Sequence, residues 1–286
     1  MTTFEAVVLA VVEGLTEFLP ISSTGHLILA NSILGIDPQS EFAKLYIINI
    51  QFGAILSILF LYWKRFLQSI SFYYKLFLGF IPAAIFGLLL NDYIDSLLES
   101  VTTVAISMVL GGIVLVLLDK FFETSITESN TDNDLEHVHV IDKLGIETKE
   151  IRLKAFPINY KQSFIIGLFQ VIAMIPGVSR SAATILGGLQ QGLNMKRAAE
   201  FSFFLAVPTI TAAAGYKLLK GFNHIKGSDM QMLLLGNAIS FIVAIFAIRF
   251  FINLITRYGL KFFGWYRIIV GTAILILLLM GKSLHI

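Results

Sequence analysis

Six stretches of the chain are long and apolar enough to cross a lipid bilayer, and they constrain the fold more than any other feature. They lie at about residues 43–63, 75–92, 100–118, 199–218, 230–252 and 263–281. A membrane-spanning helix needs about 20 largely apolar residues. Only 14% of the 286 residues are charged, whereas soluble domains carry about 25%. The chain is therefore predicted to be an all-α polytopic membrane protein with six transmembrane helices.

Two further apolar stretches, at about residues 4–34 and 162–192, are each interrupted by a proline and then by a polar run. The prolines are Pro20 and Pro176. Proline ends or kinks a helix, and non-helical backbone at membrane depth is tolerated only where protein or a water-filled cavity surrounds it. We therefore predict two re-entrant helical hairpins, each of which enters and leaves the membrane on the same side.

The two halves of the chain resemble each other at a nearly constant offset. Three pairs of segments match at offsets of 156, 157 and 159 residues: Glu17–Thr24 with Ala173–Arg180, Leu78-Gly79 with Leu235-Gly236, and Gly112 with Gly271. This favours a duplication, with a first repeat at 1–118, a loop at 119–161 and a second repeat at 162–286. Three spans per repeat make an odd number of crossings, which inverts the second copy relative to the first.

Lysine and arginine gather on one of the two faces that six spans create. That face includes Lys64, Arg65, Lys196 and Arg197 and the basic residues of the 119–161 loop. Cytoplasmic loops carry such an excess, so we expect this face to be cytoplasmic and both termini and the mouth of the first hairpin to lie outside. His137 and His139 are interpreted as solvated loop residues, because no second cluster of metal ligands accompanies them.

The total composition excludes some classes of function. A net charge of +2 does not favour nucleic-acid binding, and the absence of cysteine leaves the redox compartment open. The first apolar run is interrupted by Glu13 and Glu17, and no basic region precedes it. We therefore expect it to be part of the mature protein rather than a signal peptide.

The first hairpin carries an unusual polar cluster, Glu13-Gly-Leu-Thr-Glu17-Phe-Leu-Pro-Ile-Ser22-Ser23-Thr24-Gly-His26. Glu13 and Glu17 are four residues apart, so on a helix they share one face. Two adjacent carboxylates repel each other, and a divalent cation, a shared proton or an arginine must neutralise them. After Pro20, the hydroxyl residues are suited to capping a second short helix whose free N–H groups point at an anion.

The second hairpin carries Pro176-Gly177-Val-Ser179-Arg180-Ser181-Ala-Ala-Thr184. The Arg180 guanidinium can bind a phosphate with two parallel hydrogen bonds, and Ser179, Ser181 and local N–H groups can complete an anion site. The alternative is a structural arginine that neutralises Glu13 or Glu17, and the two interpretations can coexist. Gln170 is interpreted as the counterpart of Glu13, bridging the hairpins by hydrogen bonds.

His26 has two interpretations. An isolated histidine inside a fold usually bonds a backbone carbonyl, but this one lies two to four residues from three hydroxyls and downstream of paired carboxylates. That setting favours acid–base or nucleophilic work.

These motifs resemble, in the same order, those of the bacterial undecaprenyl-diphosphate phosphatases, also called bacitracin-resistance proteins. The resemblance covers the whole chain. It implies an enzyme of cell-wall (peptidoglycan) synthesis that hydrolyses a C55 isoprenoid diphosphate to the monophosphate and inorganic phosphate. It also implies antibiotic resistance, a bacterial inner-membrane location and dependence on a divalent cation such as Mg²⁺ or Ca²⁺. The sequence leaves a homodimer open.

The residue types fit this chemistry. We expect Arg180, Ser179 and hairpin N–H groups to hold the diphosphate, with Ser22, Thr24, Gly177, Ser181 and Gln170 as further substrate-binding residues. Glu13 and Glu17 are predicted to bind the metal or orient the nucleophile. Ser23 is the first candidate nucleophile, ahead of Thr24 and His26, and His26 is the candidate base or proton donor. The alternative function is a transporter or flippase of a phosphorylated lipid or another anion, since broken helices that meet in mid-membrane are typical of transporters.

Overall fold

The computed structural model describes residues 1–37, 40–67, 69–98, 100–122, 135–141, 147–153, 156–221, 229–281 and 284. The first half contains α1 (Thr3–Thr16), α2 (Ser23–Leu34), α3 (Glu41–Leu61), α4 (Trp63–Phe66), α5 (Ile70–Leu89), α6 (Asn91–Leu98), α7 (Val101–Asp119) and the short 3₁₀ helix η1 (Lys120–Phe122). The second half contains α9 (Tyr160–Ile172), α10 (Arg180–Gln190), α11 (Met195–Gly221), α12 (Asp229–Tyr258) and α13 (Lys261–Leu279).

Six of these helices are long and apolar enough to cross a membrane: α3, α5, α7, α11, α12 and α13. They coincide with the six predicted spans, with ends that differ by a few residues. Many large apolar side chains lie on their outer surfaces, including Phe77 and Phe246. This is the surface expected of a multi-pass membrane protein, since lipid solvates such side chains.

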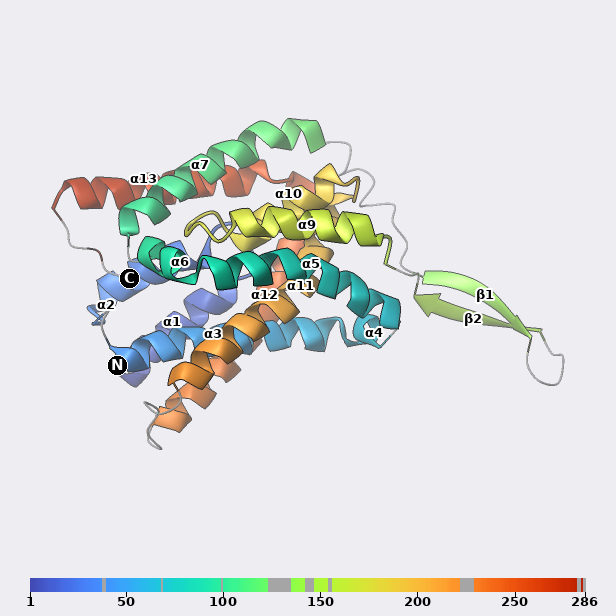
Figure 1. Ribbon diagram of the computed structural model, residues 1–286, viewed down its shortest axis with the longest axis horizontal. Helices are drawn as coiled ribbons and strands as arrows, with labels where there is room; N and C mark the ends of the chain where they lie inside the picture. Colours follow the sequence, from blue (N-terminus) through green and yellow to red (C-terminus); the bar gives the residue numbers. More distant parts are fainter. Residues whose placement is uncertain are drawn as a thin grey trace.

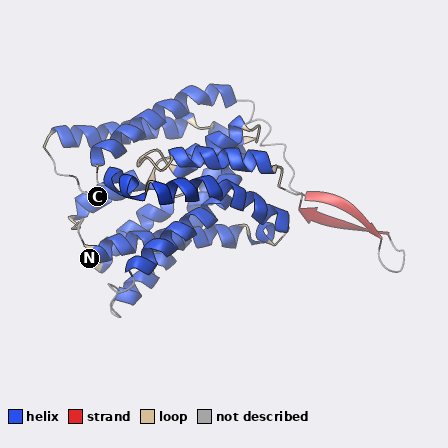
Figure 2. Ribbon diagram, in the orientation of Figure 1, coloured by secondary structure: helices blue, strands red, loops and turns tan. Residues whose placement is uncertain are grey.

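A two-stranded antiparallel hairpin projects from one end of the helical bundle (Figures 1 and 2). Its strands are β1 (Leu135–Ile141) and β2 (Glu147–Leu153), and Leu135 pairs with Leu153. The prediction of an all-α chain therefore holds for the membrane helices but not for the predicted loop at 119–161, where alternating residues favour strands. His137 and His139 lie in β1. Both chain termini lie at the opposite end of the bundle (Figure 1).

Two helix pairs, α1 with α2 and α9 with α10, are each interrupted by an irregular segment. Together with the first residues of the helix that follows, we call these segments the first break (17–23) and the second break (173–181). In the first pair, α1 and α2 contact each other, and Met1 and Leu34 at their outer ends pack against the same apolar cluster. In the second pair, the Gln162 side-chain amide donates a 2.8 Å hydrogen bond to the carbonyl of Gln191. Each pair therefore folds back on itself, and the breaks predicted from Pro20 and Pro176 are confirmed.

The two breaks have the same backbone geometry. Ser22 and Ser179 have φ of 71° and 74°, and no other non-glycine residue in the described part of the chain has a positive φ. Each caps the helix that follows: Gly25 N–H donates to Ser22 Oγ at 3.4 Å, and Ala182 N–H donates to Ser179 Oγ at 3.3 Å. A side-chain oxygen at this position satisfies a free N–H of the first turn.

The starts of the two helix pairs also match. Thr2 and Glu5 form a capping box at α1, and Asn159 and Gln162 form one at α9, again 157 residues further along. The match of Ser22 with Ser179 has the same offset, so the alignment of Ser23 with Ser179 made from the prolines is wrong by one residue. The reason is that two residues lie between Pro176 and its capping serine, Ser179, whereas only one lies between Pro20 and Ser22.

Candidate active site

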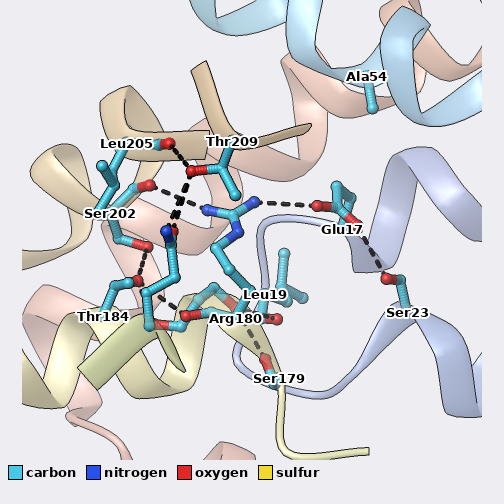
Figure 3. Close-up of polar contacts among 12 residues, drawn as sticks. Glu17, Leu19, Ser23, Ala54, Ser179, Arg180, Thr184, Ser202, Leu205 and Thr209 are labelled. Carbon is cyan, nitrogen blue, oxygen red and sulfur yellow. Dashed lines mark hydrogen bonds and ion pairs between the residues drawn. The ribbon is translucent and has the colours of Figure 1, made fainter. Parts of the chain in front are cut away.

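The two breaks meet at an ion pair inside the bundle. Arg180 Nη2 lies 3.0 Å from Glu17 Oε1, with 14% and 8% of the two side chains exposed. Arg180 Nη1 donates a 2.9 Å hydrogen bond to the carbonyl of Ser202 in α11, which holds the guanidinium plane in place (Figure 3). The pairing of this arginine with a first-hairpin carboxylate, one of the two interpretations of Arg180, is thus present in the structure.

The same carboxylate also holds Ser23. Ser23 Oγ donates a 2.8 Å hydrogen bond to Glu17 Oε2, so Glu17 lies between the serine and the arginine (Figure 3). Ser23 is the first residue of α2, directly after the positive-φ Ser22. A hydroxyl that donates to a carboxylate is in position to lose its proton to that base, which is the arrangement of an activated nucleophile.

Serines of the second break connect the two hairpins. Ser181 Oγ donates a 2.7 Å hydrogen bond to the carbonyl of Leu19 in the first break, and Ser179 and Ser181 hydroxyls lie 3.0 Å apart. Thr184 Oγ1 donates to Ser202 Oγ at 2.7 Å, which fixes α10 against α11. The predicted substrate residues Ser179 and Ser181 therefore also have structural partners.

Glu13 is fully buried, and neither of its carboxylate oxygens has a hydrogen-bond partner in the structure. Glu13 lies in the last turn of α1, and the N–H of Glu17 donates to its carbonyl at 2.9 Å, so the predicted one-face arrangement of the two glutamates is confirmed. An unpaired buried carboxylate is costly.

A divalent cation would relieve this cost. Mg²⁺ is typically bound by one or two carboxylates together with substrate phosphates, and Glu13 and Glu17 supply such oxygens. Within the described residues no group of three histidine, aspartate or glutamate side chains could hold a metal by itself. The residues thus fit a cation shared with a phosphate ligand rather than an all-protein metal cage.

The two ring nitrogens of His26 bond to groups outside the ion pair. Its Nδ1 lies 2.8 Å from the carbonyl of Ser22, and its Nε2 lies 2.8 Å from the hydroxyl of Tyr266 in α13. The His26 and Tyr266 rings are parallel, with centroids 5.6 Å apart. A carbonyl accepts only, so in the neutral ring Nδ1 carries the proton and Nε2 accepts from the tyrosine. His26 thus bonds to a backbone carbonyl, as the first of its two interpretations expected, and it also bonds to a tyrosine hydroxyl.

Within the described residues, the Gln170 side chain bonds to α11 and not to the first hairpin, so the predicted bridge between the hairpins is not found there. It is buried, and its amide Nε2 lies 3.1 Å from Thr209 Oγ1 in α11. Thr209 in turn donates a 2.8 Å hydrogen bond to the carbonyl of Leu205. The prediction fails because a long helix, α11, lies beside α10 and offers its own hydroxyl to the amide.

The remaining predicted residues lie in the two breaks or beside them. Ser22 is buried as the cap of α2, and Thr24 follows in the first turn of that helix, partly buried. Gly177 is buried, has a φ of 91°, and approaches α7 so closely that a Cβ atom would lie 2.3 Å from the carbonyl of Val104. Only glycine fits this position.

Sequence reasoning missed Arg267, which is fully buried in α13. Its guanidinium donates hydrogen bonds of 2.8–3.3 Å to five backbone carbonyls: those of Pro20 in the first break, Gly177 and Val178 in the second, and Ser107 and Met108 in α7. Arg267 therefore joins the two breaks. The sequence feature that could have identified Arg267 is its position inside a predicted span, because a charged residue at membrane depth is costly.

Comparison with known proteins gives one consistent result. The family model described as bacitracin resistance protein BacA matches residues 6–273. A protein of Bdellovibrio bacteriovorus named undecaprenyl-diphosphatase is 49% identical over 100% of this chain and 99% of its own length. Proteins of the same name from Flavobacterium johnsoniae and Porphyromonas gingivalis are 48% and 44% identical, each over 100% of this chain and over 98% and 100% of their own length.

Proposed function

Because the chain belongs to the bacitracin resistance protein BacA family, we propose that it is an integral membrane phosphatase that converts undecaprenyl diphosphate to undecaprenyl phosphate and inorganic phosphate. The observation that carries this proposal is the continuous contact from Ser23 through Glu17 to Arg180 across the two breaks. It combines a hydroxyl, a base and a phosphate-binding cation in one place. The role of the protein in the cell is to recycle the lipid carrier of cell-wall synthesis.

The α1–α2 and α9–α10 pairs are, in this proposal, re-entrant hairpins of an inverted repeat, with the repeats at 1–118 and 162–286. The matching capping serines and capping boxes support the duplication. The first hairpin opens toward the end that holds the termini, and the second opens toward the end with β1 and β2 (Figure 1). Hairpins that open toward opposite ends are what an inverted repeat requires.

The orientation follows from the basic residues. Lys64 and Arg65 lie in α4 at the same end of the bundle as the β1–β2 hairpin (Figure 1). By the positive-inside tendency this end is cytoplasmic. Both termini then lie outside the inner membrane, and the candidate active site opens toward the outer face.

The reaction uses the residues of both breaks. Arg180 gives up part of its contact with Glu17 and binds the diphosphate, together with Ser179 and N–H groups of the breaks. Ser23 transfers its proton to Glu17, and Ser23 Oγ attacks the terminal phosphorus. The bond from that phosphorus to the bridging oxygen breaks, and its electron pair leaves with the lipid monophosphate. Water then attacks the phosphoserine and inorganic phosphate leaves, while Ser23 Oγ takes its proton back from Glu17, which restores both side chains.

Phosphoryl transfer depends mainly on positioning and on neutralising charge. Glu13 and Glu17 would hold a divalent cation, Mg²⁺ or Ca²⁺, which when bound neutralises phosphate charge. The orphaned oxygens of Glu13 support this. Added chelator should therefore abolish activity, and added Mg²⁺ should restore it.

Phosphate release tests the function. The purified protein in detergent, given lipid diphosphate and Mg²⁺, should release inorganic phosphate without any ion gradient, which separates a phosphatase from a transporter. Glu17→Ala and Arg180→Ala should each abolish release, whereas Glu41→Gln, in the exposed Glu41–Lys44 pair, should not change it. A wild-type protein that releases no phosphate would overturn the proposal.

A further inference from the structure

Arg249 is an arginine on the outer surface of a membrane helix. It lies in α12, one of the helices long and apolar enough to cross a bilayer, and it is exposed. Its neighbours Phe246 and Phe250 are 65% and 60% exposed, so this face of α12 is turned toward lipid. No hydrogen bond or ion pair to the Arg249 guanidinium is present within the described part of the chain. A charged group at membrane depth without a partner marks a candidate binding site.

Arg249 also lines an open cavity of about 380 Å³ between α12 and the end of α3. The other lining residues are Leu61, Tyr62, Ile248 and Ile252. None of the five is acidic, so Arg249 gives the cavity a positive charge, and three aliphatic side chains form the rest of its wall with the Tyr62 ring. This combination suits a ligand with an anionic head and an apolar body.

The depth of the cavity is that of a lipid headgroup. Tyr62 directly precedes Trp63, whose side chain is 53% exposed, and tryptophan and tyrosine favour the membrane–water interface. Lys64 follows, with its ammonium 5.7 Å from the Trp63 ring centre. An arginine just inside this level can extend its guanidinium toward the interface while its stem stays among apolar groups.

We propose that this cavity binds the phosphate headgroup of an anionic glycerophospholipid from the leaflet at the β1–β2 end of the bundle. The Arg249 guanidinium pairs with the phosphodiester oxygens, and Leu61 and Ile252 contact the start of the acyl chains. Basic pockets between membrane helices recognise anionic headgroups in this way. The site shares no residue with the Ser23–Glu17–Arg180 contact, and it depends only on the chain being a membrane protein.

Lipid retention tests the site. The full chain is reconstituted in phosphatidylcholine alone or in phosphatidylcholine mixed with phosphatidylglycerol, and native mass spectrometry then measures the phosphatidylglycerol that stays bound. We expect the wild-type protein to retain one tightly bound phosphatidylglycerol. Arg249→Gln should weaken this retention roughly tenfold, the loss expected for a charge-assisted hydrogen bond. Arg249→Lys should keep part of it.

Arg257→Gln is the matched control, because it removes the same charge from the exposed surface of the same helix without touching the cavity. It should retain phosphatidylglycerol as the wild type does. Equal losses in both arginine variants would show general attraction to an anionic bilayer and would overturn the proposal. So would unchanged retention in Arg249→Gln, or equally tight retention of phosphatidylcholine by the wild type.

Discussion

The breaks of the two hairpins have the same backbone conformation but carry side chains of different chemical type. Ser22 and Ser179 adopt the same positive φ and cap the next helix in the same way. At the next position, the first break has Ser23 and the second has Arg180. Met174 stands in the second hairpin where the first has Glu17, at the same offset of 157 residues. The same backbone conformation thus carries acidic and hydroxyl side chains in one helix pair and a basic side chain in the other.

In the proposed mechanism, neither break is a complete active site by itself. In that mechanism the first break supplies the nucleophile and the base, and the second supplies the cation that binds the phosphate. Arg267 of α13 belongs to neither, yet it binds carbonyls of both. Helix α13 is therefore a third element that holds the two breaks together.

The largest difference in activity is expected between alanine substitutions of Ser23 in the first break and of Ser181 in the second. Ser23→Ala removes the proposed nucleophile and should lower kcat by about a thousandfold. Ser181→Ala should lower kcat by less than about tenfold and cost about 1 kcal/mol of stability, because it loses one hydrogen bond, to Leu19. Phosphate-release kinetics and thermal melts measure both.

A different result for Ser23 would reassign the nucleophile. If Ser23→Ala keeps near-normal turnover while His26→Ala or Glu17→Ala abolishes it, the role passes to histidine or to an activated water.

Arg267 should determine whether the two breaks stay together. Arg267→Leu removes five hydrogen bonds to backbone carbonyls, three of which lie in the two breaks, and we expect it to lower the unfolding free energy by about 3 kcal/mol or more. Arg257→Leu, which changes an exposed arginine, is the control and should shift the melting temperature little. Equal melting temperatures for the two variants would show that Arg267 does not hold the two breaks together.

If the backbones at the two capping serines are equivalent, the same substitution at Ser22 and at Ser179 should lower the stability of the protein equally. Ser22→Ala and Ser179→Ala each lose a cap and keep a strained positive φ, so each should cost about 1–2 kcal/mol. Glycine at either position relieves the φ strain and should cost only a few tenths of a kcal/mol. Melting curves of the four variants test this, and a large glycine penalty at only one site would break the equivalence.

The smallest effect is expected at Tyr266. Tyr266→Phe keeps the ring beside His26 and removes the hydroxyl bonded to Nε2. We expect less than about a tenfold fall in kcat/KM, because this loses one orienting hydrogen bond. A loss as large as that of Ser23→Ala would instead place His26 at the centre of the chemistry.

Much of the fold could be predicted from the sequence because apolar length alone identifies membrane helices. The six spans, the two breaks and the glutamates on one face of α1 followed from local patterns. Local patterns did not reveal the partners of Gln170, His26 and Arg267, which lie on α11, α13 and the breaks. The one-residue error in aligning the repeats arose because proline marks a break without fixing its length.

The most direct measurement of the central claim is a double-mutant cycle across the two breaks. Phosphate release by Glu17→Gln, Arg180→Gln and the double variant gives the coupling between the two side chains. If both breaks form one active site, the double variant should lose about as much kcat/KM as either single variant. Losses that multiply in the double variant would mean that the two residues act independently, and would contradict a shared site.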